Sequence, residues 1–328
     1  MALAVAQHAD VPMKPLLDLK FVFVIGKGGV GKSSVSAALA LAAAARGKRV
    51  LLAMCNTKER LSYLLQTAPV GPKIVNVAPN VDAVNMEPAA ALEEYGLLIL
   101  KVRALYKVIF ENRFVAAFLR GTPGIDAWAM LGKAQYHAFQ QDSAGRDRYD
   151  MVIVDAPATG HGLELLRVPR VIVDVAPPGL LRKEAERAWQ LFSDPERAGV
   201  LLVTIPEDMP ASETLELDAA IRGELNLPVA GLVVNQMMPR LFQPGEVALL
   251  EALAARSAAG SQLQPYLVSS HGRAEREALQ HACMERLRAG IKAPCVTLPL
   301  LLGNDFRRAQ VEQLAGVLQQ AASFAGTS

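Results

Sequence analysis

Continuous apolar runs alternate with amphipathic segments along most of this 328-residue chain. The first strong run, Phe21 to Ile25, predicts a strand that is buried on both faces, because no polar residue interrupts it. A glycine-rich turn follows, and then a predicted helix over roughly Lys32 to Arg46 that ends at Gly47. A second apolar run, Val50 to Met54, completes a β-α-β unit, which implies parallel strands and a right-handed crossover.

Later apolar runs predict further strands, and helical patterns separate most of them. The predicted strands are Met151 to Val154, Val200 to Ile205, Val229 to Val234 and Val296 to Leu298, with shorter candidates at Lys73 to Val77 and Val81 to Met86. In the last third of the chain, helical patterns cover Arg273 to Arg288 and Arg307 to Ala322. This alternation is typical of an α/β fold, so we expect a three-layer, doubly wound and mostly parallel sheet.

The domain organisation follows from the same pattern. No linker rich in Gly, Ser or Pro divides the chain, so we expect an N-terminal extension over residues 1–19 and a single domain over residues 20–328. Two helical insertions are expected in this domain, at about residues 88–141 and 178–192. The apolar stretch Leu97 to Leu119 has three interpretations, which are core packing, a dimer contact, and a client or membrane surface.

Composition narrows the classes of function. Hydrophobic residues make up 52% of the chain, which excludes intrinsic disorder. The 34 basic and 32 acidic residues leave a net charge of +2, so no overall basic field favours nucleic acid. Aromatic residues make up 5%, too few for base-stacking surfaces to be a theme. We expect no nucleic-acid partner.

The cysteine content and the absence of long apolar runs both bear on the cellular compartment of the protein. The three cysteines, Cys55, Cys283 and Cys295, form no close pair, which disfavours a disulfide framework and a C-x-x-C metal site. We expect them to be small buried residues rather than a site that needs converging thiolates. The first twenty residues lack a charged leader before a long apolar run, and no apolar segment has the roughly 20 residues needed to span a bilayer. A cytoplasmic protein is therefore expected.

The turn after the first strand carries the strongest chemical signal. Residues 26–33, Gly-Lys-Gly-Gly-Val-Gly-Lys-Ser, match G-x-x-x-x-G-K-[ST]. Glycines let such a loop curl until its N–H groups face an anion, and the following helix presents its positive end there. Lys32 can reach the β- and γ-phosphates, and Ser33 can ligate Mg²⁺. The sequence therefore predicts a site for ATP and Mg²⁺. The nucleotide-binding residues predicted in this turn are Gly28, Gly29, Val30, Gly31, Lys32, Ser33 and Ser34.

The apolar strand predicted near residue 151, taken here as Tyr149 to Asp155, ends in an acid. Such an acid suits the Walker B position, where an aspartate holds Mg²⁺ through water. The predicted magnesium residues are thus Ser33 and Asp155. The alternative is that Asp155 only caps the turn that follows the strand.

The turn has an additional lysine, Lys27, and resembles the deviant Walker A motif of the family that contains MinD, ParA, the nitrogenase iron protein, ArsA and the Get-pathway targeting ATPase. In that family the additional lysine reaches across a dimer interface to the partner's nucleotide. The resemblance therefore implies a dimer and a catalytic role for Lys27. A solvated loop lysine is the alternative.

The segment after Asp155 narrows the resemblance within this family. Residues 155–163, Asp-Ala-Pro-Ala-Thr-Gly-His-Gly-Leu, look like the D-T-A-P-T-G-H-T-L switch II of the ArsA and Get-pathway ATPases. The match includes Thr159, Gly160 and His161, although His161 has the alternative of an ordinary turn histidine.

Weaker matches follow this segment, so the resemblance covers residues from about Phe21 to Leu318. Thr204 to Glu207 with Glu213-Thr214 is similar to I-P-E…E-T, and Val233 to Gln236 resembles V-V-N-Q, in which the asparagine, here Asn235, reads adenine. Leu298 to Leu301, which includes Pro299 and Leu300, resembles the segment that closes over the base.

Switch I departs from the family pattern. The family has D-P-A-H-N-L-S, and its aspartate orients the attacking water, whereas residues 55–62 here are Cys-Asn-Thr-Lys-Glu-Arg-Leu-Ser. Asn56 stands in the place of the aspartate and cannot accept a proton. Glu59 is the only nearby carboxylate that could take over this role. We predict an ATPase that binds ATP well and hydrolyses it slowly alone. The catalytic residues implied are Lys27, Lys32, Asn56 and Asp155.

The resemblance implies an ATP-dependent dimeric switch that couples its nucleotide state to a transporter or another client. It is nearest to a bacterial branch in which two unequal ArsA-like proteins act together, so a homodimer and a heterodimer with a related ArsA-like ATPase both remain open. The zinc-binding C-x-x-C of the Get-pathway enzyme is absent, and no methionine occurs between Pro169 and Gly199, which argues against a tail-anchored client. A positioning ATPase like MinD or ParA is the alternative, although the chain offers neither a basic C-terminal helix nor a basic surface.

Overall fold

The computed structural model describes residues 13–55, 57–100, 124–157, 159–257, 261–303, 305–321 and Phe324. Within these residues eight strands form one sheet in the order β3-β4-β2-β5-β1-β6-β7-β8, and every neighbouring pair except β3-β4 is parallel. The strands are β1 Phe21–Ile25, β2 Val50–Cys55, β3 Val75–Ala78, β4 Val81–Met86, β5 Met151–Asp155, β6 Ala198–Thr204, β7 Val229–Met237 and β8 Cys295–Pro299. The predicted α/β fold with a doubly wound, mostly parallel sheet is confirmed.

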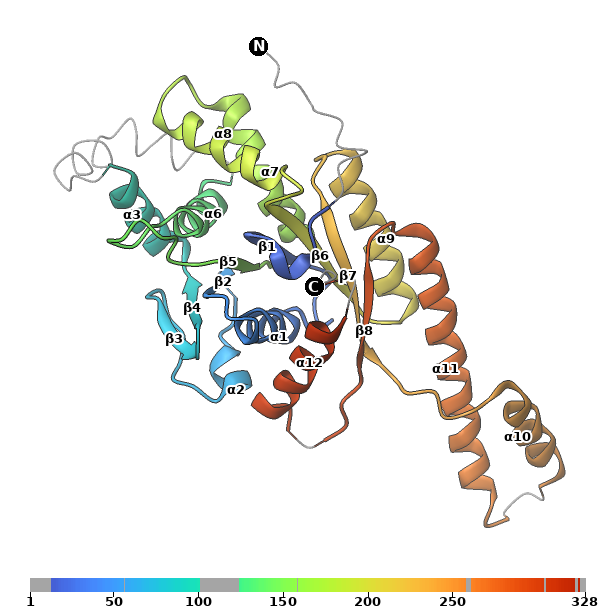
Figure 1. The fold of residues 1–328 in the computed structure, drawn as a ribbon. Helices are drawn as coiled ribbons and strands as arrows, with labels where there is room; N and C mark the ends of the chain where they lie inside the picture. Colours follow the sequence, from blue (N-terminus) through green and yellow to red (C-terminus); the bar gives the residue numbers. More distant parts are fainter. Residues whose placement is uncertain are drawn as a thin grey trace.

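Helices cover both faces of this sheet (Figure 1). On one face lie the short helix η1 Leu16–Asp18 and the helices α1 Lys32–Ala45, α2 Leu61–Leu65 and α12 Arg308–Gln320. On the other face lie α3 Pro88–Leu100, α6 Ile125–Ala138, α7 Thr159–Val175, α8 Leu180–Phe192, α9 Asp208–Gly223 and the C-terminal part of α11 Gln264–Gly290. Helix α10, Pro244–Arg256, packs against α11.

Successive side chains of β1 belong to two hydrophobic cores, one on each face of the sheet. Phe21 and Phe23 face one helical layer, where both rings contact Phe192 of α8, whereas Val22 and Val24 face the other layer. Because β1 lies in the middle of the sheet and is buried on both sides, the turn that follows it is held by a rigid neighbourhood.

Several boundaries differ from those expected from the sequence. Leu16, Leu17 and Leu19 are buried in the core, so the packed unit begins before residue 20. Strand β7 runs to Met237 rather than ending at Val234, and helices α7, α9 and α10 are additional to the predicted elements. The insertion expected at about 88–141 contains α3 and α6, and most of the apolar stretch 97–119 lies outside the described residues. None of the described helices has the length and apolar character needed to cross a membrane.

Candidate functional site

The glycine-rich turn lies at the C-terminal edge of the sheet, between β1 and α1. Gly29 and Gly31 have φ angles of 87° and 90°, in the left-handed region that disfavours side chains. A Cβ atom on Gly31 would also lie 2.4 Å from the Nδ2 atom of Asn235. Gly31 directly precedes Lys32, the first residue of α1, so the unpaired N–H groups of the helix start at the turn. The turn thus has the form of an anion cradle.

Three polar side chains meet beneath this turn. The Ser33 hydroxyl donates to Oδ2 of Asp155 at 2.7 Å, and the Ser36 hydroxyl lies 3.3 Å from Oδ1 of the same carboxylate. Asp155 ends β5, beside β1, and is fully buried. Burial raises its pKa, and the hydrogen bond from Ser33 and the charge of Lys32 act in the opposite direction. Ser33 and Asp155 therefore present hard oxygen atoms side by side, the donor set that Mg²⁺ prefers.

Lys32 points into the curl of the turn. Its ammonium group donates to the main-chain carbonyl of Lys27 at 3.0 Å. Burial lowers the pKa of Lys32, and the carboxylate of Asp155 partly offsets that effect. Because burial disfavours the charged ammonium group, an anion in the cradle would improve its environment.

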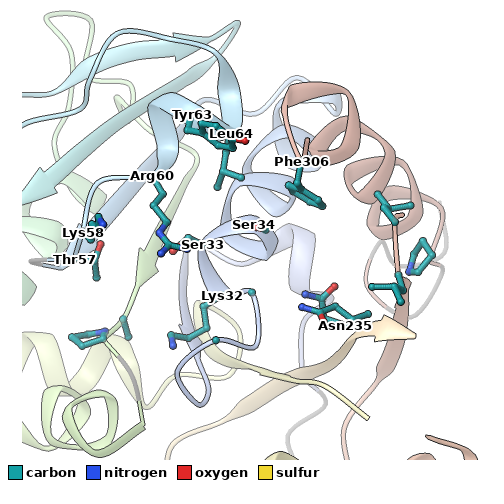
Figure 2. Close-up of a pocket in the computed structure, with 18 residues that line it drawn as sticks. Lys32, Ser33, Ser34, Thr57, Lys58, Arg60, Tyr63, Leu64, Asn235 and Phe306 are labelled. Carbon is teal, nitrogen blue, oxygen red and sulfur yellow. The ribbon is translucent and has the colours of Figure 1, made fainter. Parts of the chain in front are cut away.

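A cavity of about 800 Å³ opens above the cradle, a size that suits a small-molecule ligand (Figure 2). Lys32, Ser33 and Ser34 line it, and so does Asn235, which lies beside the glycine-rich turn. The complete lining is Gly29, Gly31, Lys32, Ser33, Ser34, Thr57, Lys58, Arg60, Tyr63, Leu64, Ala156, Pro157, Asn235, Gln236, Pro299, Leu300, Leu301 and Phe306. Predicted site residues from three distant parts of the chain are thus brought together around one cavity.

One end of the cavity is built where β7 and β8 end. Asn235 is buried, and its Nδ2 group donates to the carbonyl of Val30 in the glycine-rich turn at 2.9 Å. The next residue, Gln236, has a φ of 58°, a left-handed conformation that non-glycine residues rarely adopt. The N–H group of Leu300 donates to the carbonyl of Met237 at 2.8 Å, which places Pro299 and Leu300 against the same end.

Lys27 does not line the cavity in this conformation. Its ammonium group lies 2.5 Å from Oε1 of Glu213 and 2.9 Å from the sulfur of Met209, both on α9. Gly28 and Val30 belong to the same turn but also do not line the cavity, and Val30 is buried in the core. The additional lysine of the turn is therefore paired within its own chain.

The two predicted switch segments are described only in part. Asn56 lies outside the described residues. Thr159, Gly160 and His161 belong to the first turn of α7, and their side chains lie outside what the structure describes. The carboxylate of Glu59 accepts hydrogen bonds from the N–H group and the hydroxyl of Ser62, at 2.8 and 2.6 Å, so in this conformation it caps α2.

Several cavity residues were not predicted from the sequence. Lys58 and Arg60 come from the loop before α2, and neither side chain has an ion-pair partner among the described residues. In Figure 2 the Arg60 side chain extends toward Ser33. Together with Lys32 they give the cavity an excess of positive charge, because no acidic residue is among the described residues that line it. Their position in the switch I segment was the available signal.

An aromatic contact closes the cavity wall between α2 and the loop before α12. The guanidinium of Arg307 lies 4.0 Å from the centroid of the Tyr63 ring, and the Tyr63 hydroxyl lies 3.1 Å from Oδ1 of Asp305. Phe306, between these two loop residues, lines the cavity. This wall depends on residues more than 240 positions apart, so local patterns gave no signal for it.

The described residues hold no cluster of three or more His, Cys, Asp or Glu side chains suited to a metal ion. The three cysteines are free thiols on β2, α11 and β8, and burial raises the pKa of the Cys55 thiol far above its ordinary range.

A parallel α/β sheet with this turn at the edge of its central strand, Ser33 hydrogen-bonded to Asp155 and a positively charged cavity above defines a nucleotide-binding protein of the P-loop class. The sequence profile of the anion-transporting ATPases, the ArsA family, matches residues 19–176. This match covers just under half of the chain, and over it the chain is similar to the ArsA and Get-pathway ATPases.

Bacterial and yeast ATPases are similar to the chain. ATPase BagA of Mycobacterium tuberculosis is 28% identical over 238 residues, which cover 71% of this chain and 69% of that protein. The arsenical pump-driving ATPase of Escherichia coli is 27% identical over 240 residues, or 67% of this chain and 40% of that protein. ATPase GET3 of Kluyveromyces lactis is 24% identical over 261 residues, or 69% of this chain and 74% of that protein.

Proposed function

We propose that this protein is an ATP-binding, dimeric switch ATPase that acts in the cytoplasm and couples its nucleotide state to a transporter or another client. The observation that carries the proposal is the group formed by Lys32, Ser33 and the buried Asp155 at the base of a cavity with excess positive charge. Such a cavity complements a triphosphate, and Asn235, which also lines it, offers amide groups to a base.

The residues present fit Mg²⁺-bound ATP. In the proposed arrangement the N–H groups of residues 28–33 and the ammonium of Lys32 hold the phosphates, while Ser33 and Asp155 hold the metal. Mg²⁺, when bound, supplies charge neutralisation at the phosphate oxygens. Lys32 adds a charge-assisted hydrogen bond that strengthens as negative charge develops on the transferred group. A change in the phosphates would reach α7 directly, because this helix begins four residues after Asp155.

Calorimetry with ATP and phosphate release by the purified chain test this proposal. We expect saturable binding of ATP that Mg²⁺ tightens, together with measurable hydrolysis. A chain that binds neither ATP nor ADP would contradict the proposed function.

We propose further that hydrolysis is slow in the isolated chain. Asn56 can position a water but cannot accept its proton, and the carboxylate of Glu59 is engaged with Ser62. Lys58 and Arg60 favour binding of a triphosphate without supplying a base.

Asn56→Asp is expected to raise the turnover number about tenfold or more, in the range of a general-base contribution, with little change in ATP affinity. Steady-state phosphate release measures turnover, and calorimetry measures affinity. Glu59→Gln, which keeps the α2 cap largely intact, serves as the matched control and should leave turnover unchanged. Brisk turnover of the parent with no gain in Asn56→Asp would contradict the slow-hydrolysis proposal.

The dimer is proposed on the identity of Lys27 rather than on an observed interface. Within one chain Lys27 is held by Glu213, and both side chains are about one third exposed. Such an ion pair contributes about 1 kcal/mol or less, so a partner's phosphate can displace Glu213 at small cost. A homodimer and a heterodimer with a related ArsA-like ATPase are both compatible with this exchange.

Lys27→Gln is expected to leave ATP affinity of the monomeric chain within about threefold of the parent, while the turnover number falls about tenfold or more. The reason is that Lys27 would act on nucleotide only in the closed dimer. Light scattering with and without ATP, at matched concentrations, should show a loss of ATP-dependent association. Lys14→Gln, an exposed lysine outside the site, is the control. Undiminished turnover and association in Lys27→Gln would remove the basis for the dimer.

A further inference from the structure

Helix α10 and the first half of α11 form a helical arm, residues 244–257 and 261–276, that projects from the body of the protein (Figure 1). The arm follows β7, so it leaves the sheet at the edge that holds the cavity. Its exposed large apolar side chains include Leu249, Leu253, Leu263 and Tyr266. Exposed apolar residues gathered on one projecting element are typical of an interaction surface.

The base of the arm is fixed by buried polar contacts. Glu277 is buried and accepts hydrogen bonds from Nε of Arg273 at 2.7 Å and from the N–H group of Leu241 at 3.1 Å. Gln280 accepts a hydrogen bond from the N–H group of Met238 at 3.0 Å. Because Met238 directly follows β7, these contacts tie α11 to the strand that carries Asn235. The base of the arm is therefore tied to the cavity edge, which limits the freedom that docking would cost.

The outer side of α10 carries an ordered stripe. Glu246, Leu249, Leu253 and Arg256 are spaced by three, four and three residues, so they lie along one side of the helix. Leu249 is 59% exposed and Leu253 is 47% exposed. Val247 and Leu250 point elsewhere on the helix and are only partly exposed, which is consistent with α10 packing against α11. The stripe thus faces away from its own chain.

This stripe is symmetric about residue 251. Its order is acid, leucine, leucine, base, and each position has its counterpart at the same distance on the other side of the centre. When two copies of such a helix meet in antiparallel orientation, Leu249 lies opposite the partner's Leu253, and Glu246 lies opposite the partner's Arg256. Parallel pairing would instead place like charges together. A twofold axis pairs one patch with itself, which is what this order satisfies.

We propose that the arm docks onto the arm of a second copy of this chain, through antiparallel contact of the two α10 stripes. The contact needs no nucleotide and stands apart from the proposed ATPase cycle. Two short stripes bury less than the roughly 800 Å² per partner of a standard interface, so the arms form a weak contact that holds two cavity edges near each other. Charge pairs at the rim of the stripe select orientation more than they add affinity.

Sedimentation of the full chain without nucleotide, over about 1–300 μM, measures this association. We expect a concentration-dependent dimer in the parent. Leu253→Arg places a charge at the centre of the contact and is expected to raise the dissociation constant about tenfold or more. Leu279→Arg, on α11 outside the arm and similarly exposed, is the matched control and should associate as the parent does.

A charge exchange tests the antiparallel pairing itself. Arg256→Glu and Glu246→Lys are each expected to weaken self-association, because each homodimer then opposes like charges twice. An equimolar mixture of the two variants restores opposite charges at both ends and is expected to return association to the parent level. Fraying of α10 in Glu246→Lys, whose carboxylate also caps the helix, would not be rescued by mixing.

Three results would overturn the proposal: a monomeric parent throughout this range, equal loss in Leu253→Arg and Leu279→Arg, or a mixture that fails to recover. Dimerisation only with a different, related chain would also overturn it. ATP binding measured on the same samples separates this question from the proposed function. Arm variants are expected to bind ATP as the parent does, whereas a parent that associates without binding ATP would refute the proposed function alone.

Discussion

Lys32→Ala is expected to lower the affinity for ATP about a hundredfold or more and to bring hydrolysis below detection. Each hydrogen bond that a charged group makes to a buried partner contributes about 1.5–3 kcal/mol, and Lys32 would make two to the phosphates. The ammonium group is already inside the curl of the turn, 3.0 Å from the Lys27 carbonyl, so little rearrangement precedes binding. Its removal also leaves Asp155 without its nearest compensating charge.

Calorimetry with ATP measures this loss directly. Lys58→Ala is the matched comparison, since Lys58 lines the same cavity but is exposed, so its charge is screened by water. We expect a reduction of about threefold or less for Lys58→Ala. Equal affinities in Lys32→Ala and the parent would show that the phosphate cradle is assigned to the wrong turn.

Asp155→Asn is expected to lower ATP hydrolysis about a hundredfold or more while weakening ATP binding far less. The carboxylate is fully buried, and the Ser33 hydroxyl donates to it at 2.7 Å, so the variant loses an oxygen ligand and a negative charge where Mg²⁺ is proposed. The decisive measurement is the effect of Mg²⁺ on ATP affinity. The parent should bind more tightly with Mg²⁺, and Asp155→Asn should lose most of this difference.

Stability provides a second, opposite readout for the same variant. Because burial raises the pKa of Asp155, the ionised carboxylate opposes folding at pH values above the ordinary carboxyl range, where the unfolded chain has lost this proton. The nucleotide-free Asp155→Asn protein should therefore melt at the same or a higher temperature than the parent near neutral pH. Asp150→Asn, which breaks the surface pair with Arg49, is the control and should keep full hydrolysis. Parent-level turnover in Asp155→Asn would contradict its proposed role.

Local sequence patterns were sufficient to predict the central part of the fold, which is β1, the glycine-rich turn and α1. The uninterrupted apolar residues of β1, the glycines of the turn and the end of α1 before Gly47 each depend on nearest neighbours along the chain, and their boundaries agree with the structure within one residue. The placement of Ser33 beside Asp155 was also predictable. Ser33 follows β1 and Asp155 ends β5, and parallel strands end at the same edge of the sheet.

Other features depended on tertiary contacts and could not be predicted in this way. Lys27 pairs with Glu213 across 186 positions, and Phe306 joins the cavity wall only because its neighbours meet Tyr63. Helix α10 has leucine and alanine on more than one side, so its sequence gave no clear amphipathic period. The sequence indicates Glu59 only as a nearby base. In the structure its carboxylate instead caps α2, because Ser62 lies three residues further along the chain and donates to it.

The hydrogen bond from Asn235 to the Val30 carbonyl has a consequence for selectivity between purines. One N–H of this amide is committed to the main chain, which leaves one donor and one acceptor for a base. That remaining pair complements the exocyclic amine and N7 of adenine, whereas guanine presents two acceptors along the same edge. A contact internal to the protein would thus make GTP a poor substitute, because accommodating it would require Asn235 to release the turn that holds the phosphates.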